Sequence, residues 1–170
     1  HGLNEASALL LIAENFSSLG RAGAWRELAT RRLGQFMQDV VDGDGVEVEN
    51  SPYYHFYVLT AAQQIADWAK RHGVGLPPHF SAKTASMTRY ATYITQPDGF
   101  VPLLAASVQL NVRKYEPDLY SQIGAQDPAF EYIRTGGQKG TMPPSSARAV
   151  IFPISGQVAL RSGFDAAMFG

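Results

Sequence analysis

The stretch SPYYHFYVLTAAQQIADWAKRHG, from Ser51 to Gly73, carries helix signals at both of its ends. Ser51 is a preferred N-cap residue, and Pro52 suits the first helical position, where its missing N–H costs no hydrogen bond. Gly73 marks the other end, because glycine readily adopts the left-handed conformation that closes many helices. We therefore predict a long helix that starts at Pro52 and ends at about Arg71.

Apolar residues recur with helical spacing in three further segments, 2–16, 22–41 and 81–94. Only short connectors separate these segments, which favours helices packed as antiparallel hairpins. Signals between 103 and 135 are shorter and mixed, and they predict irregular helices around 117–123 and 128–133. The fold class predicted for residues 1–135 is therefore mainly α.

The C-terminal part of the chain changes character. Residues 136–147 are rich in Gly, Pro and Ser and have the composition of a linker. Residues 149–152 and 157–161 then resemble two strands joined by a turn. We predict a helical domain over 1–135, a linker over 136–147 and the beginning of a β domain over 148–170. A lone hairpin is marginal in water, so it should pack on the helices or pair with another polypeptide.

Composition excludes several classes of function. Hydrophobic residues make up 45% and charged residues 17% of the 170 residues, which is typical of a globular domain. The net charge of -1 favours neither nucleic acid nor an anionic membrane as a partner. No apolar run approaches the roughly 18 residues of a membrane span. The chain has no cysteine, and its four histidines lack metal-ligand spacing, so we expect no metal.

The residues around the helix start also carry a family resemblance. The stretch Asp44–His55, DGVEVENSPYYH, resembles a heparinase II/III signature, in which an acidic-Gly turn precedes a Glu-x-Ser-Pro-x-Tyr-His helix start. Weaker resemblances follow the order of the family: His1–Leu3 is similar to the end of its Asn-His-Gly segment, 97–102 to its Pro-Asp-Gly turn, and 152–164 to its first β hairpin. Together they span nearly the whole chain.

This resemblance implies part of an incomplete (α/α) toroid, followed by the first strands of an antiparallel β-sandwich domain. It also implies cleavage of an acidic, uronic-acid-containing polysaccharide or oligosaccharide by β-elimination, without a cofactor. The family often has Gly-Asp-Ser where this chain has Ala105-Ala106-Ser107, which weakens any role for an acid there.

We also expect the chain to be a piece of a longer periplasmic or secreted protein. Its partner would then be the rest of the toroid and the β domain, which would supply the family's Asn and β-domain histidine. The piece alone should be inactive.

β-Elimination requires a group that neutralises the sugar carboxylate, a base that removes the C5 proton and an acid that protonates O4. By the resemblance, Tyr54 is the catalytic tyrosine, acting as the acid and also as the base if a nearby positive group lowers its pKa. Tyrosine suits the acid role because its ordinary pKa of about 10 keeps its proton available. His1 matches the motif histidine and would help to hold the carboxylate.

Four neighbours of Tyr54 complete the candidate site. Tyr53 occupies the variable motif position and is a candidate sugar contact. His55 is expected to support the catalytic tyrosine by hydrogen bonding. Glu49 and Asn50 lie beside the helix start and are expected to be structural or to support the residues that bind substrate.

Two other functions stay open at this point. One is a carbohydrate-binding toroid without catalysis. The other is a toroid glycoside hydrolase, which needs two carboxylates flanking the scissile bond. Carboxylates are available at Glu5, Glu14, Glu47 and Glu49. An unsaturated product that absorbs in the near ultraviolet would distinguish a lyase from a hydrolase.

Overall fold

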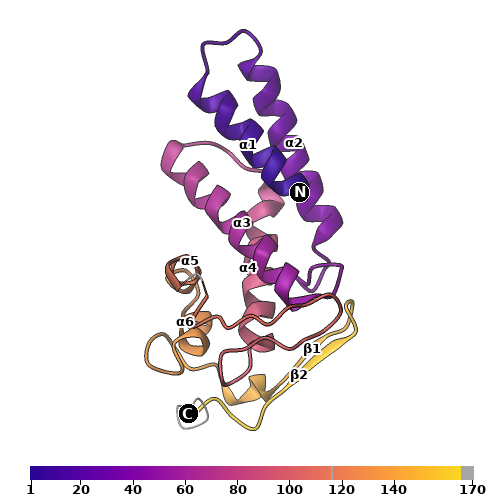
Figure 1. Ribbon diagram of the computed structural model, residues 1–170, viewed down its shortest axis with the longest axis vertical. Helices are drawn as coiled ribbons and strands as arrows, with labels where there is room; N and C mark the ends of the chain where they lie inside the picture. The colour runs from indigo at the N-terminus through magenta and orange to yellow at the C-terminus, as the bar shows by residue number, and fades with distance from the viewer. Residues whose placement is uncertain (116, 166–170) are drawn as a thin grey trace.

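A computed structural model describes residues 1–115 and 117–165 and shows a mainly helical chain (Figure 1). Helices α1 and α2 form one antiparallel hairpin, and α3 and α4 form a second one beside it. Two short helices and a two-stranded antiparallel sheet follow near the end of α4. The elements are α1 Gly2–Asn15, α2 Ala22–Val40, α3 Pro52–His72, α4 Pro78–Ile94, α5 Pro117–Gly124, α6 Pro128–Arg134, a 3-10 turn Ser145–Arg148, β1 Ala149–Phe152 and β2 Gln157–Leu160.

Helix α3 begins and ends as its sequence predicts. The Ser51 side chain accepts a hydrogen bond from the backbone N–H of Tyr54 at 3.3 Å, and Pro52 occupies the first turn. Gly73 closes the helix with φ 67°, in the left-handed region. Helix α4 begins at Pro78 rather than at the predicted Ser81, because the fixed φ of this proline already suits a first helical residue. The other element bounds lie within one residue of those predicted.

One contiguous core joins the four long helices. The apolar face predicted for α1 included Ile12 and Phe16, but these are 45% and 56% exposed, and the buried residues of α1 are Leu3, Ala6, Leu10 and Ala13. A fully buried Leu or Phe side chain contributes roughly 1.5–3 kcal/mol by leaving water. The core therefore fixes the two hairpins against each other. Its fully buried members include Leu10, Leu33, Met37, Phe56, Leu59, Phe80 and Met87.

The β hairpin packs on helix α4, which confirms the first of the two arrangements predicted for it. Val150 and Phe152 on its inner face join a second, smaller core cluster with Tyr90 of α4. The rings of Tyr90 and Phe152 meet edge to face at 5.0 Å, and the Tyr90 hydroxyl donates to Gln157 at 2.7 Å. The division of the chain into domains stays a prediction.

Two charged side chains fasten the hairpin to the helical part. The Asp44 carboxylate accepts hydrogen bonds from the backbone N–H groups of Ile154, at 2.6 Å, and Ser155, at 3.1 Å. Arg161 donates to the carbonyls of Tyr93 and Thr95 at the end of α4, where the helix dipole favours a positive charge. The predicted acidic-Gly turn, which contains Asp44, therefore also anchors the hairpin.

Replacing Asp44 should loosen the hairpin and leave the helices intact. Hydrogen bonds to a charged group contribute about 1.5–3 kcal/mol, so Asp44→Ala should speed amide exchange of residues 149–160 by about tenfold or more. Asp39→Ala is the matched control, because it removes the same charge from an exposed position on α2. Hydrogen–deuterium exchange that is equally slow in the hairpin of both variants would contradict this role.

Candidate functional site

A groove of about 570 Å³ lies where the start of α1, the end of α2 and the start of α3 meet. We call it the Tyr54 groove. It brings together Tyr53 and Tyr54 with Glu49 and with His1, which is some fifty residues away in the chain. The residues that line it are His1, Leu3, Asn4, Phe36, Val40, Glu47, Val48, Glu49, Tyr53, Tyr54, Tyr57 and Val58.

The first turn of α3 is held by two serine hydroxyls. Ser51 caps the helix, and its hydroxyl lies 3.0 Å from the hydroxyl of Ser107. The Ser107 hydroxyl also accepts from the backbone N–H of Tyr53 at 3.3 Å. Successive helical residues point about 100° apart, so this fixed start directs Tyr54 into the groove and His55 into the core.

Tyr54 is accessible in the groove. Its side chain is 41% exposed, and its ring meets that of Tyr53 edge to face at 5.5 Å. Within residues 1–115 and 117–165, no group is hydrogen-bonded to its hydroxyl. His1 is an exposed residue at the start of α1 and lines the same groove. An accessible phenol and a histidine that line one groove form an arrangement that can transfer a proton to or from a bound ligand.

His55 does not support Tyr54 by hydrogen bonding, contrary to the sequence-based prediction. Its ring is buried against Tyr90 at 4.6 Å, and Nε2 lies 3.0 Å from the carbonyl oxygen of Met87. Because a carbonyl only accepts, Nε2 carries the proton. Burial lowers the pKa of His55 to about 4, so the ring is neutral near pH 7. Its role here is to fasten α3 to α4.

Asn50 also lies outside the residues that line the groove. It adopts a left-handed conformation with φ 54°, and its side-chain oxygen accepts from Gln157 at 2.8 Å. This contact joins the helix start to the β hairpin, in agreement with a structural role. Glu49, by contrast, is exposed and lines the groove.

Glu47 is a groove residue that sequence reasoning did not assign to the lyase site. Its side chain is 3% exposed and accepts from the backbone N–H of Glu49 at 3.2 Å. Burial raises its pKa to about 6. A carboxyl group with this pKa is partly protonated under mildly acidic conditions and is able to donate or accept a proton there.

Asn4 and Tyr57 were also missed. The Asn4 amide donates to the Tyr57 hydroxyl at 2.6 Å across the groove, which ties α1 to α3. Spacing gave a usable signal for Tyr57, because it follows Tyr53 and Tyr54 by one helical turn and so shares their face. The sequence spacing gives no sign that Tyr57 contacts Asn4.

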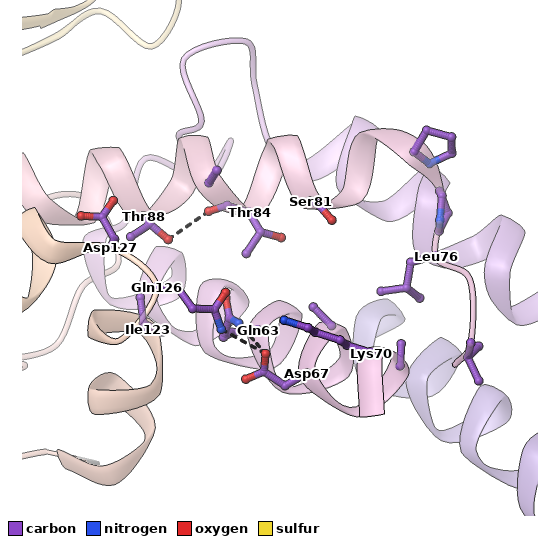
Figure 2. A pocket seen from close by; sticks show the side chains of 16 residues that line it. Gln63, Asp67, Lys70, Leu76, Ser81, Thr84, Thr88, Ile123, Gln126 and Asp127 are labelled. Atoms are coloured by element: carbon purple, nitrogen blue, oxygen red, sulfur yellow. Dashed lines mark hydrogen bonds between the residues drawn. The ribbon is translucent and has the colours of Figure 1, made fainter. Parts of the chain in front are cut away.

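A separate cavity of about 470 Å³ lies between α3 and α4, and none of the predicted site residues line it. Figure 2 shows the side chains around it. Asp67 accepts there from Gln63 at 3.0 Å and from Gln126 at 3.1 Å. Thr84 and Thr88 donate to carbonyls of their own helix. These polar groups serve the packing of α3, α4 and the loop after α5, so we place the candidate site in the Tyr54 groove.

Antiparallel helical hairpins with a groove across their ends define a segment of an (α/α) toroid. Comparison with known proteins supports this fold class. The family model Heparinase II/III N-terminus matches residues 1–132. The heparin-sulfate lyase of Pedobacter heparinus is 24% identical over 169 residues, which cover 97% of this chain and 25% of that protein. The chain therefore belongs to the heparinase II/III family.

Solved structures share the fold. A mutant heparan sulfate lyase from Pedobacter heparinus has a TM-score of 0.79 and 22% identity, covering 96% of this chain and 26% of its own. A heparinase III structure has a TM-score of 0.74 and 20% identity, covering 88% and 24%. The chain thus spans about a quarter of the length of these relatives. No helix among the described residues is long and apolar enough to cross a membrane.

The buried His55 should make stability depend on pH. Its pKa falls from 6.5 in the unfolded chain to about 4 in the folded one, so unfolding takes up a proton between these values. Stability is therefore complete above pH 6.5 and falls towards pH 4, by about 3 kcal/mol from this group. Glu47 opposes the loss, because its raised pKa makes the folded state bind its proton more tightly between 4.5 and 6.

Urea unfolding at several pH values between 4 and 7 tests this effect. His55→Gln should flatten the pH dependence, whatever it does to stability at pH 7. His72→Gln, at an exposed histidine on the same helix, should keep the wild-type slope. If His55→Gln and wild type lost stability equally steeply, burial of a neutral His55 would not be the cause.

Proposed function

We propose that the protein containing this chain is a polysaccharide lyase that cleaves uronic-acid-containing polysaccharide by β-elimination. The observation that carries the proposal is the Tyr54 groove, in which an exposed tyrosine hydroxyl and His1 line one cavity. Membership of a family whose relatives include heparin-sulfate lyases supports it.

Each step of the elimination has a candidate group on this chain. The His1 side chain acts as a donor to the sugar carboxylate and so favours loss of the C5 proton. Tyr54 donates its phenolic proton to the departing O4 as the C4–O4 bond breaks. For Tyr54 to serve as the base as well, it enters the reaction as a phenolate, takes the C5 proton and then donates that proton to O4, which restores the phenolate. Tyr53 flanks the same space as a sugar contact.

The start of α3 assists an acidic substrate electrostatically. A helix N-terminus carries a partial positive charge, and α3 presents its first turn to the groove. Glu47 and Glu49 work against an anion, and protonation of Glu47 reduces that repulsion. The rest of the polypeptide is the expected partner that completes the site. A periplasmic or secreted location suits a polysaccharide substrate and belongs to the same proposal.

A glycoside hydrolase is the second candidate, and one observation favours it. Glu47 and Glu49 line the same groove, and the raised pKa of Glu47 is typical of a general acid. Against it, the Glu47 carboxylate is engaged by the backbone of Glu49. The product separates the two reactions, since elimination leaves an unsaturated sugar that absorbs in the near ultraviolet and hydrolysis does not.

Tyr54→Phe in the full-length protein should abolish turnover and leave folding almost unchanged. The change removes one hydroxyl from an exposed ring, so packing is kept. Loss of a general acid should lower kcat about 10²–10⁴-fold, and more if the phenolate is also the base. Ultraviolet absorbance of the product and thermal unfolding should be measured on the same preparation.

Tyr93→Phe is the matched control, because it makes the same change on α4, outside the groove. It should keep the wild-type rate. A Tyr54→Phe protein that keeps near-normal activity would remove Tyr54 from the mechanism.

A further inference from the structure

His1 and Tyr54, which line the Tyr54 groove together, belong to different helical hairpins (Figure 1). His1 is the N-cap residue of α1, and its carbonyl accepts a hydrogen bond from the backbone N–H of Glu5 at 3.1 Å. Its side chain makes no capping hydrogen bond. Tyr54 lies in the first turn of α3. The separation of the two side chains is therefore set by how α1 is placed against α3, and not by either helix alone.

A hydrogen bond joins these two helices one turn behind both groups. Asn4 follows His1 by three residues, and Tyr57 follows Tyr54 by three residues. The Asn4 side-chain amide donates to the Tyr57 hydroxyl at 2.6 Å. Three residues advance an α-helix by about 4.5 Å. The hydrogen bond therefore lies within one helical turn of the residues that it would hold in place.

Packing and hydrogen bonding constrain the two helices differently. Both helices contribute to the main core, Leu3 from α1 and Val58 from α3 among others. Apolar burial is non-directional, so packing alone tolerates a small displacement of one helix along the other. A hydrogen bond holds only over a narrow range of distance and angle. Within residues 1–115 and 117–165, no other hydrogen bond joins α1 to α3, so the Asn4–Tyr57 bond supplies the directional constraint.

The exposure of the Asn4–Tyr57 bond makes it suited to setting geometry. Asn4 is exposed, and Tyr57 is 49% exposed. Water is therefore able to satisfy either group when the other is removed, and no buried polar atom is left without a partner. Loss of the bond should change the arrangement of the groove more than the stability of the fold.

We propose that Asn4 and Tyr57 form a positioning pair, which holds His1 and Tyr54 at the separation that the elimination requires. The inference rests on the proposed function for the roles of those two groups. His1 must reach the sugar carboxylate while Tyr54 reaches the proton and the leaving oxygen of the same ring. A misplacement of 1 Å is able to lower a rate about 10²-fold. The pair acts through His1 and Tyr54, without itself contacting the reacting atoms.

Tyr57→Phe in the full-length protein removes the hydroxyl and keeps the ring. It should lower kcat about 10-fold and change KM by less than about twofold, because the groups that bind the sugar are kept. Asn4→Ala should cause the same loss, and the double variant no further loss, because each change breaks the same hydrogen bond. Asn4→Asp should restore kcat, since its carboxylate accepts from the Tyr57 hydroxyl.

Tyr132→Phe is the matched control, because the Tyr132 hydroxyl also makes a hydrogen bond, to the Phe164 carbonyl at 2.9 Å, and Tyr132 does not line the groove. The Tyr57→Phe and Tyr132→Phe variants should show similar small decreases in Tm, and Tyr132→Phe should keep the wild-type kcat. An equal loss of kcat in both variants would overturn the positioning role. Losses from Tyr57→Phe and Asn4→Ala that add up in the double variant would also overturn it.

Cross-linking separates this inference from the proposed function, because it requires no turnover. His1→Cys and Tyr54→Cys are combined in full-length protein without other accessible cysteines, and rigid bis-maleimides of graded length are applied. Adding Tyr57→Phe should slow the fastest of these reactions about 3-fold or more, since a looser pair spends less time at any one separation.

Identical cross-linking with and without Tyr57→Phe would overturn the positioning pair, and a lyase reaction that depends on Tyr54 would stand. Slower cross-linking in a protein without lyase turnover would refute the proposed function and keep the geometric role of Asn4 and Tyr57.

Discussion

The start of helix α3 is the constraint on which the site depends. Ser51 caps the helix, Ser107 holds both the cap and the Tyr53 backbone, and Pro52 fixes the first turn. With that origin fixed, the helical rotation of about 100° per residue exposes Tyr54 and buries the residue after it. A shift of the start by one residue would bring a neighbour of Tyr54 into the groove in its place. The packing of His55 against α4 resists such a shift, because its imidazole is hydrogen-bonded to the backbone carbonyl of Met87.

The β hairpin is tied to the same region of the chain. Asp44 binds its turn, Asn50 binds Gln157, and Tyr90 contacts both Phe152 and His55. These contacts surround the segment from the acidic-Gly turn to the first residues of α3, where the strongest family resemblance lies. That segment therefore holds the hairpin by hydrogen bonds on one side and places Tyr54 in the groove on the other. Neighbouring residues of one sequence motif therefore have different positions: Asn50 and His55 hold elements together, whereas Tyr54 lines the groove.

The helices and their caps were predictable from the sequence, because both depend on residues that are close together in the chain. The periodic apolar residues gave the long helices, and the Ser-Pro pair gave the start of α3. Contacts between distant segments were not predictable: nothing in the sequence joins Asn4 to Tyr57 or Asp44 to the hairpin turn. His55 was wrongly expected to support Tyr54, because adjacency in sequence was taken for adjacency in space, whereas neighbours on a helix face different ways. Glu47 was considered only as a hydrolase carboxylate, since its burial is a property of the fold.

The most direct test of the central claim is a crystal structure of the full-length Tyr54→Phe protein with an oligosaccharide of its cognate polysaccharide bound. We predict a sugar chain in the Tyr54 groove, with the glycosidic O4 beside the edge of the ring at position 54 and the carboxylate of the reacting sugar facing His1. An oligosaccharide seated in the α3–α4 cavity of Figure 2, with the Tyr54 groove empty, would contradict the account.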